Sequence, residues 1–149
     1  MILYFAYGSN MDRLAMAKRC PQARPLGIAV IDGYRFTIGA DGYASLVRAP
    51  GNAVHGVLWH LTPRDLAALD AYESIDTGLY RRAVLPVRFA GRTTRALLYL
   101  GRRPGQGRPR GNYLQSVIAA ARDWKLPRGY IARLGRCAPR ARTRAGERT

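Results

Sequence analysis

The feature that most constrains the fold is a series of short apolar segments, most of them ended by a turn rich in glycine or proline. Short apolar runs bounded by such turns are typical of β-strands. The strand-like segments are residues 2–7, 27–39, 44–48, 54–61, 83–89 and 94–100. Because few helical segments separate them, we expect an α+β fold around a small mixed, mostly antiparallel sheet that is curled.

Two turns predict hairpins within this sheet. Pro50-Gly51-Asn52 lies between residues 44–48 and 54–61, and Gly91 lies between residues 83–89 and 94–100. Asp32-Gly33 interrupts residues 27–39, which predicts either two strand pieces or one bulged strand.

Four segments have helical signals. Ser9 or Asn10 can cap a helix that runs to about Cys20, with Asp12 in its first turn. Thr62-Pro63 supplies a capping hydroxyl and a proline at the first helical position, which predicts a helix to about Tyr72 or Glu73. Asn112 can cap a third, amphipathic helix, and residues 128–134 predict a short fourth one.

The length of 149 residues fits one domain, which we place at residues 1–135, followed by a basic, flexible tail at residues 136–149. No apolar run approaches the length of a membrane span, and the apolar start lacks the basic region of a signal peptide. Cys20 and Cys137 lack the spacing of a disulfide framework or a metal site. We therefore expect a cytoplasmic protein with reduced thiols and no membrane association.

The net charge of +16 attracts polyanions, and arginine supplies almost all of it. Arg102, Arg103, Arg108 and Arg110 lie in a segment without acidic residues, and the tail is also rich in arginine. Three explanations are open: solvated arginines that reflect a GC-rich genome, an acidic protein partner, or nucleic acid. Both arginine-rich segments lack the aromatic residues on which bases stack, which argues against nucleic acid.

Glu73 is the first candidate for a functional residue. It is one of only two glutamates, and the helical period places it on the same stripe as Leu66 and Leu69. A carboxyl group in apolar surroundings has a raised pKa, which suits a group that accepts and donates protons near neutrality. The alternative is that the helix has ended and Glu73 is solvated or pairs with Arg81 or Arg82.

The second candidate is the turn Tyr7-Gly8-Ser9-Asn10-Met11, which follows an apolar strand and precedes a helix. Free backbone N–H groups at such a turn suit a carboxylate or an oxyanion, and Gly8 lets a ligand approach the backbone closely. An ordinary strand-turn-helix connection with a capping residue has the same pattern.

Other groups give weaker signals. His55 and His60 are five residues apart on one strand and therefore lie on opposite faces, so they cannot bind one metal ion together. No set of Ser, His and Asp indicates nucleophilic catalysis, and we expect Cys20 to be structural. Tyr80 is close to Glu73 in the sequence and either lines the same pocket or belongs to the core.

Taken together, these segments resemble the γ-glutamylcyclotransferase family, including the AIG2-like proteins. The resemblance rests on Leu3-Tyr4-Phe5-Ala6-Tyr7-Gly8-Ser9-Asn10, Gly56-Val57-Leu58-Trp59, Leu69-Asp70-Ala71-Tyr72-Glu73 and Thr77-Gly78-Leu79-Tyr80. It covers most of residues 1–135 and implies a sheet closed into a barrel with flanking helices.

The resemblance also implies an activity: release of 5-oxoproline and a free amine from a γ-glutamyl substrate. It implies that Glu73 is the acid/base residue, that Tyr7 to Met11 and Tyr80 bind the substrate, and that no metal or other cofactor takes part. The substrate would be a γ-glutamyl amino acid, a γ-glutamylamine or glutathione. Alternatives are a γ-glutamyl group on an acidic carrier protein, or a binding module for nucleic acid, and the resemblance allows a homodimer.

Overall fold

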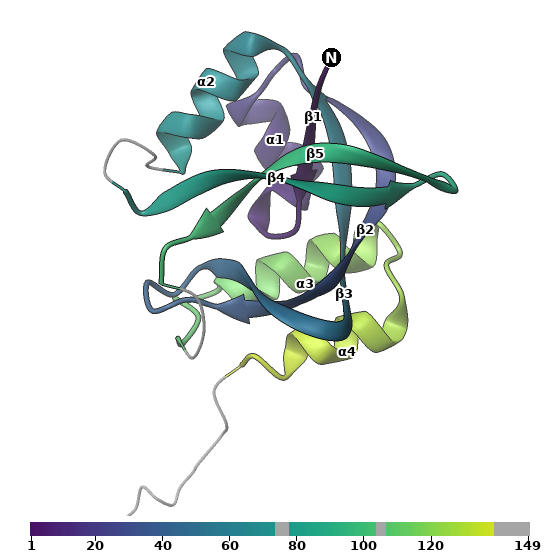
Figure 1. Ribbon diagram of the computed structural model, residues 1–149. Coiled ribbons are helices and arrows are strands. Elements are labelled where there is room, and N and C mark those ends of the chain that lie inside the picture. Colours follow the sequence, from purple (N-terminus) through teal and green to yellow (C-terminus); the bar gives the residue numbers. More distant parts are fainter. Residues whose placement is uncertain (74–77, 104–106, 139–149) are drawn as a thin grey trace, which may run out of the picture.

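The sheet is a closed barrel of five strands in the order β1-β3-β2-β4-β5 (Figure 1). The strands of this computed structural model are β1 Ile2–Ala6, β2 Arg24–Ile38, β3 Ala44–Leu61, β4 Tyr80–Phe89 and β5 Arg92–Gly101. The structure describes residues 1–73, 78–103 and 107–138. The expected α+β barrel with flanking helices is thus confirmed.

Strand β1 closes the barrel and makes the sheet mixed. It pairs antiparallel with β3, where Ile2 lies opposite Leu61, and parallel with β5, where Tyr4 lies opposite Leu97. All other strand pairs are antiparallel. Because β1 has a neighbour on each side, Phe5 and the residues next to it are fully enclosed.

Strands β2 and β3 form one long, bent pair. Strand β2 continues through Asp32-Gly33 with a register shift, so the prediction of a bulged strand is confirmed. The predicted hairpin at Pro50-Gly51-Asn52 is wrong: β3 runs unbroken from Ala44 to Leu61. Its two halves pair with the two halves of β2 on either side of the bulge, so the turn residues bend the strand without reversing it.

Strands β4 and β5 form the second predicted hairpin. Its two turn residues, Ala90 and Gly91, have φ of 51° and 75°. Positive φ at both central positions gives a turn whose twist matches the twist of the strands. This hairpin is confirmed.

The helical start after β1 differs from the prediction. Ser9–Met11 forms a short 3₁₀ turn, η1, and the α-helix α1 begins after it at Arg13–Arg19. Asp12 caps α1, because its Oδ1 accepts hydrogen bonds from the N–H groups of Leu14 at 2.8 Å and Ala15 at 3.3 Å. Ser9 and Asn10 are therefore left outside the helix.

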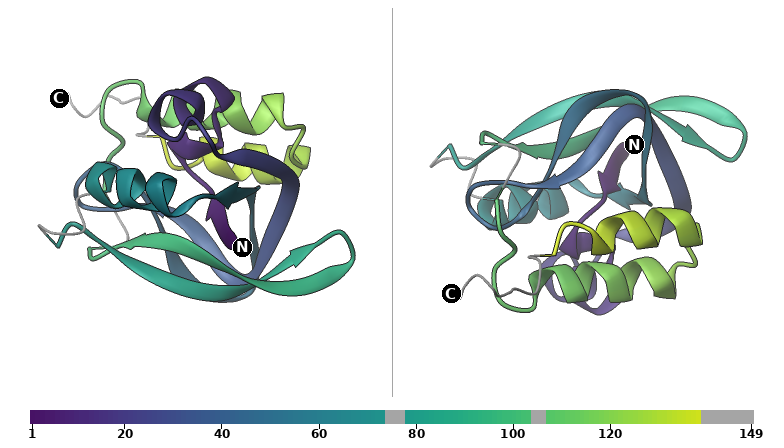
Figure 2. Two further views of the ribbon diagram at one scale, coloured as in Figure 1. Left: turned by 90° about the horizontal axis from the view of Figure 1, so that it is seen from above. Right: turned by 90° about the horizontal axis from the view of Figure 1, so that it is seen from below.

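The other helices follow the sequence signals. Helix α2, Pro63–Tyr72, begins with a reciprocal capping box between Thr62 and Asp65. Helices α3, Tyr113–Asp123, and α4, Arg128–Gly135, lie side by side on the side of the barrel away from the β4–β5 hairpin (Figure 2).

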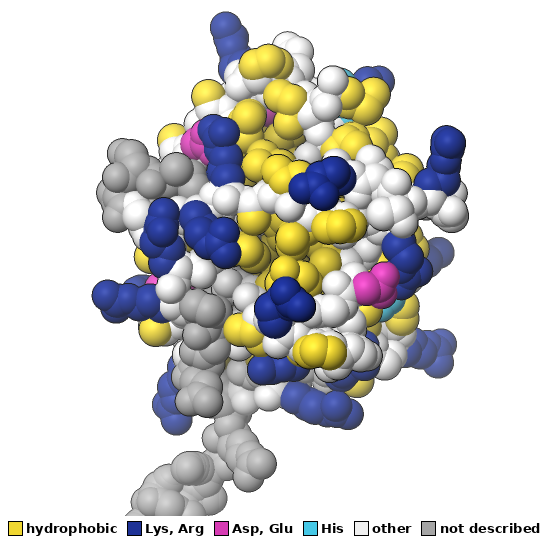
Figure 3. Space-filling model, viewed as in Figure 1, with side chains coloured by type: hydrophobic (Ala, Val, Ile, Leu, Met, Phe, Trp, Pro, Cys, Tyr) yellow, Lys and Arg dark blue, Asp and Glu magenta, His cyan; other side chains and the backbone are white. Residues whose placement is uncertain are grey.

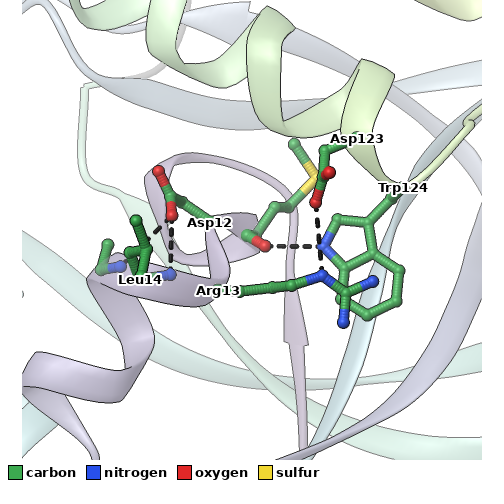
Figure 4. A network of polar contacts seen from close by, with 7 residues as sticks. Asp12, Arg13, Leu14, Asp123 and Trp124 are labelled. Atoms are coloured by element: carbon green, nitrogen blue, oxygen red, sulfur yellow. Dashed lines mark hydrogen bonds and ion pairs between the residues drawn. The ribbon is translucent and has the colours of Figure 1, made fainter.

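A network around Trp124 joins the end of α3 to the N-terminal turn (Figure 4). The indole Nε1 donates a hydrogen bond of 2.7 Å to the carbonyl oxygen of Met11. The guanidinium of Arg13 lies 3.6 Å from the ring centroid of Trp124 and contacts Asp123 at 3.3 Å. The turn that follows β1 is thus fixed by a residue more than a hundred positions later.

Positive side chains are spread around the face shown in Figure 3, with hydrophobic side chains between them. In the described part of the chain, no helix has the length and apolar character needed to cross a membrane.

Cys20 and Cys137 are both free thiols. Burial raises the pKa of the Cys20 thiol to about 11, which suits a structural cysteine. Most of the predicted tail, residues 139–149, lies outside the described residues.

Candidate functional site

One cavity brings together residues that are far apart in the sequence, from Tyr4 to Tyr113. It has a volume of about 280 Å³ and is lined mainly by tyrosines. Seven of the nine tyrosines of the chain lie in its wall. The lining residues are Tyr4, Tyr7, Gly8, Ser9, Asn10, Tyr43, Ala44, Tyr72, Glu73, Leu79, Tyr80, Tyr99 and Tyr113.

Glu73 lies at the C-terminal end of α2 and reaches this cavity from there. Its backbone N–H still donates to the carbonyl oxygen of Leu69 at 2.8 Å, so the helical turn persists to Glu73. Leu69 is completely buried beneath it, as the periodicity predicts. Arg82, which the sequence offered as a partner for Glu73, instead pairs with Asp70.

The surroundings of Glu73 change its acidity. Loss of hydration raises the pKa of its carboxyl group from 4.5 to about 7. The positive charge of Arg19 acts in the opposite direction and the negative charge of Asp41 in the same direction. The carboxyl group therefore titrates where it can serve both as a base and as an acid near neutral pH.

Asn10 connects the N-terminal turn to this carboxyl group. Its Nδ2 donates a hydrogen bond of 2.9 Å to the hydroxyl of Tyr4 and a longer one of 3.4 Å to Oε2 of Glu73. Asn10 is buried, at 3% exposure, although it is polar. A buried side-chain amide needs such partners, and the site supplies them.

Gly8, Ser9 and Asn10 of the same turn line the cavity. The turn is closed by bonds from the N–H groups of Met11 and Asp12 to the carbonyl oxygens of Gly8 and Ser9, both at 3.1 Å. The N–H groups at the start of a helical turn have no acceptor within it. Those of Gly8 and Asn10 are therefore suited to hold a negatively charged oxygen, whereas the Ser9 backbone is already hydrogen-bonded to the phenol oxygen of Tyr113.

Gly8 permits a close approach in this turn. A Cβ atom at position 8 would lie 2.8 Å from the hydroxyl oxygen of Tyr113 and 3.4 Å from the Cβ of Ala44. The Tyr113 hydroxyl also accepts a hydrogen bond from the N–H of Ala44 at 3.2 Å. Only a residue without a side chain leaves room for Tyr113 here.

Three further tyrosine hydroxyls of the cavity wall are held by fixed partners. Tyr7 donates to the carbonyl oxygen of Tyr99 at 2.5 Å, and Tyr80 donates to that of Ala44 at 2.9 Å. Tyr99 donates to Asp70 at 2.7 Å. Burial raises the pKa of all three phenols above the ordinary value, so they are neutral near pH 7.

Most of the residues singled out in the sequence meet at this cavity. Tyr7, Gly8, Ser9, Asn10, Glu73 and Tyr80 all line it. Met11 is not among the lining residues: it is completely buried, and its carbonyl oxygen faces Trp124. The turn therefore reaches the cavity through Tyr7 to Asn10. Met11 holds the turn in place through its buried side chain and its hydrogen bond with Trp124.

No motif in the sequence identified five further residues of the cavity, Tyr4, Tyr43, Tyr72, Tyr99 and Tyr113. They come from four different elements and one loop, so no local spacing connects them. The one available signal was composition, because tyrosine is three times as frequent as phenylalanine in this chain.

The imidazoles lie elsewhere. His55 packs against Tyr130, with ring centroids 4.8 Å apart, and His60 contacts Arg24 at 3.4 Å. Within the described ranges, no three His, Cys, Asp or Glu residues are grouped so that they could hold a metal ion. The chemistry available at the cavity itself is that of a carboxyl group, phenols, an amide and backbone N–H groups.

Comparisons with known proteins identify relatives of this arrangement. A family model described as gamma-glutamyl cyclotransferase, AIG2-like, matches residues 4–126. The gamma-glutamylcyclotransferase of Homo sapiens is 28% identical over 145 residues, which cover 89% of this chain and 76% of that protein.

Solved structures agree with this result. A structure described as a gamma-glutamyl cyclotransferase has a TM-score of 0.85 at 25% identity and covers 96% of this chain and 91% of its own. The crystal structure of YkqA from Bacillus subtilis has a TM-score of 0.78 at 27% identity and covers 91% of this chain, but only 53% of the YkqA chain is matched.

Proposed function

The chain belongs to the gamma-glutamyl cyclotransferase, AIG2-like family, and from this premise we propose that it converts a small γ-glutamyl compound into 5-oxoproline and a free amine, with Glu73 as acid and base. The observation that carries the proposal is the position of Glu73. Its carboxyl group has a pKa of about 7 and lies in one cavity with the turn Tyr7 to Asn10.

The reaction needs few catalytic groups because both reacting atoms belong to the substrate. The α-amine of the γ-glutamyl group attacks its own γ-carbonyl carbon, a five-membered ring closes, and the bond to the leaving amine breaks. Holding the substrate in a folded conformation brings these atoms together and supplies a large part of the rate. A cavity of about 280 Å³ with rigid aromatic walls suits this task.

Glu73 supplies the proton transfers. In its ionised form it takes a proton from the α-ammonium group, which frees the nitrogen lone pair for attack. In its protonated form it gives that proton to the leaving nitrogen as the tetrahedral intermediate collapses. The attacking nitrogen loses a second proton as the ring amide forms, and the released amine takes it up and leaves as its ammonium form. A pKa of about 7 keeps both forms accessible at neutral pH.

The turn after β1 supports the negative charges of the substrate. Backbone N–H groups of the turn around Gly8 to Asn10 hold either the α-carboxylate or the oxyanion that forms on the γ-carbonyl oxygen. Tyr7 and Tyr80, whose hydroxyls are bound to backbone carbonyls, shape the wall against which the substrate folds.

A substrate panel tests the proposal directly. The purified protein is given γ-glutamyl amino acids, γ-glutamylamines and glutathione while 5-oxoproline is measured. We expect release from at least one compound, and we expect Glu73→Gln to lower kcat by about 100-fold or more.

The matched control is Glu147→Gln, which removes the only other glutamate of the chain. It should leave kcat unchanged. Wild-type turnover in a folded Glu73→Gln variant would rule out the acid/base role, and no 5-oxoproline from any compound in the panel would refute the proposed substrate class.

A γ-glutamyl group on an acidic carrier protein is the second candidate. Arg102 and Arg103 line a hollow of about 420 Å³ that shares Leu79 with the cavity of Glu73. These exposed positive charges could steer an acidic carrier toward the cavity. Arg110 is less available, because its Nε donates to the carbonyl oxygen of Asp41 at 2.7 Å.

Charge reversal separates the two candidates. Arg102→Glu with Arg103→Glu should lower kcat/KM for a γ-glutamyl group on an acidic carrier peptide and leave a free γ-glutamyl dipeptide unaffected. Arg128→Glu, on the distant helix α4, is the control. Equal effects on both substrates would exclude the carrier.

A separate salt titration with RNA tests nucleic-acid binding, since such binding weakens steeply as the salt concentration rises.

A further inference from the structure

We propose that Arg19 is a positioning residue for the carboxyl group of Glu73: it fixes the amide of Asn10 so that the NH₂ group faces Glu73, and it places a positive charge beside the same carboxyl. The inference rests on the proposed role of Glu73. Arg19 is the last residue of α1, does not line the cavity, and is remote from Glu73 in the sequence.

The contact of Arg19 with Asn10 fixes the direction of the amide. Nη1 of Arg19 donates a hydrogen bond to Oδ1 of Asn10. A guanidinium has donors only, so its partner on the amide must be the oxygen. The NH₂ group of Asn10 is therefore directed to the Tyr4 hydroxyl and to Oε2 of Glu73, the two acceptors found there.

A second contact holds Arg19 in this place. Its guanidinium lies 3.8 Å from the ring centroid of Tyr72, which is the residue before Glu73 and part of the cavity wall. A guanidinium over an aromatic face is attracted to it and kept in a fixed orientation. Arg19 thus joins the N-terminal turn to the end of α2.

Helix α2 itself provides no such charge. Its last turn contains no basic residue, and Glu73 lies at its C-terminal end, where the helix dipole disfavours a further negative charge. The guanidinium of Arg19 offsets this effect from a neighbouring helix.

Among the described groups that act on Glu73, Arg19 is the cation. The others are Asp41, which precedes β3, and the phenols Tyr4, Tyr7, Tyr80, Tyr99 and Tyr113. Burial raises the pKa of each of these phenols, so they carry no charge near pH 7. Removal of Arg19 therefore leaves Glu73 with Asp41 as its charged neighbour.

The presence of only two glutamates allows a direct test. The full chain is labelled with ¹³Cδ-glutamate and titrated by NMR, and Glu73→Gln assigns the two signals. In Arg19→Gln, we expect the titration midpoint of Glu73 to rise by about one pH unit, because a lost cation disfavours the ionised form. An unchanged midpoint would overturn the proposal.

Three further variants complete the test. Lys18→Gln removes one positive charge from the adjacent, exposed position on α1 and should leave the midpoint unchanged. Arg19→Lys keeps the charge, so the titration midpoint of Glu73 should return most of the way to the wild-type value. A midpoint as high as that of Arg19→Gln would contradict the proposal. If Arg19→Gln does not fold, Tyr72→Leu releases Arg19 from the ring and should raise the midpoint, whereas Tyr72→Phe should not.

The titration needs no substrate, so it is independent of the proposed reaction. When a substrate is known, the low-pH limb of the kcat profile should move to higher pH in Arg19→Gln, with rates about tenfold lower below the midpoint. Activity with an unmoved limb would refute the role of Arg19 and leave the proposed function intact.

Discussion

A carboxyl group with a pKa of about 7 makes the stability of the fold depend on pH. The folded protein binds the proton of Glu73 more tightly than the unfolded chain, in which its pKa is near 4.5. Its contribution is therefore fully present below pH 4.5 and is lost as the pH rises through 7.

Glu73→Gln should remove this dependence. Above pH 7 we expect the variant to be more stable than the wild type, by at most about 3 kcal/mol. The wild type must there keep an ionised carboxylate buried, whereas the amide of the variant is uncharged. Below pH 4.5 the two proteins should be equally stable. Urea unfolding at both pH values measures the difference, and a constant difference across the pH range would contradict the prediction.

Gly8 gives a second prediction at the residue scale. Gly8→Ala should destabilise the fold by about 1–3 kcal/mol, because the new methyl group lies 2.8 Å from the hydroxyl oxygen of Tyr113. Without that oxygen, the nearest Tyr113 atom to the new methyl group is Cζ at 4.0 Å. The double variant Gly8→Ala with Tyr113→Phe should therefore recover part of the loss in thermal unfolding. If the double variant is no more stable than Gly8→Ala, the loss does not come from the contact with the Tyr113 hydroxyl.

Among the elements, α1 depends most on its cap. It is a helix of seven residues, too short to be stable by itself, and Asp12 satisfies two of its first N–H groups. Asp12→Ala should cost about 1 kcal/mol of stability, measured by denaturant unfolding. Asp12→Asn keeps the accepting oxygen and should cost less, and equal losses in both variants would show that the cap contributes through charge alone.

The elements also show which parts of the fold can be predicted from local sequence. The start of α2 follows from Thr62 and Pro63, because the capping bonds involve residues three positions apart. The continuity of β3 does not follow from Pro50-Gly51-Asn52, because pairing with the bulged strand β2 decides it. Likewise, Ser9 and Asn10 resemble caps, but Asp12 provides the cap and leaves Asn10 to the cavity.

The candidate site divides in the same way. The position of Glu73 beside the cavity was predictable, because the helical period fixes its direction relative to Leu69. The wall of the cavity was not, because Tyr4, Tyr99 and Tyr113 meet only when the barrel closes and α3 packs against it. Long-range pairing, which one sequence does not reveal, determines that part.

At the scale of the whole molecule, Trp124 links the C-terminal helices to the N-terminal turn. Trp124→Phe keeps most of the ring but leaves the carbonyl oxygen of Met11 without its donor. We expect a loss of about 1–3 kcal/mol in thermal or urea unfolding, because an unpaired buried acceptor is costly.

Arg13→Ala is the matched comparison. It removes only exposed contacts to Asp123 and Trp124 and should cost less than Trp124→Phe. The reverse order of the two losses would show that the stack on the indole, and not its hydrogen bond, holds the turn.

The place of β1 between β3 and β5 has a consequence for folding during synthesis on the ribosome. Strand β1 waits for β3 on one side and for β5 on the other, so the ring cannot close until Gly101 has been synthesised. The turn with Gly8 and Asn10 waits longer still, for Trp124. A nascent chain must therefore carry one edge of β1 without its partner strand until β5 has been made, and the pocket forms late in translation.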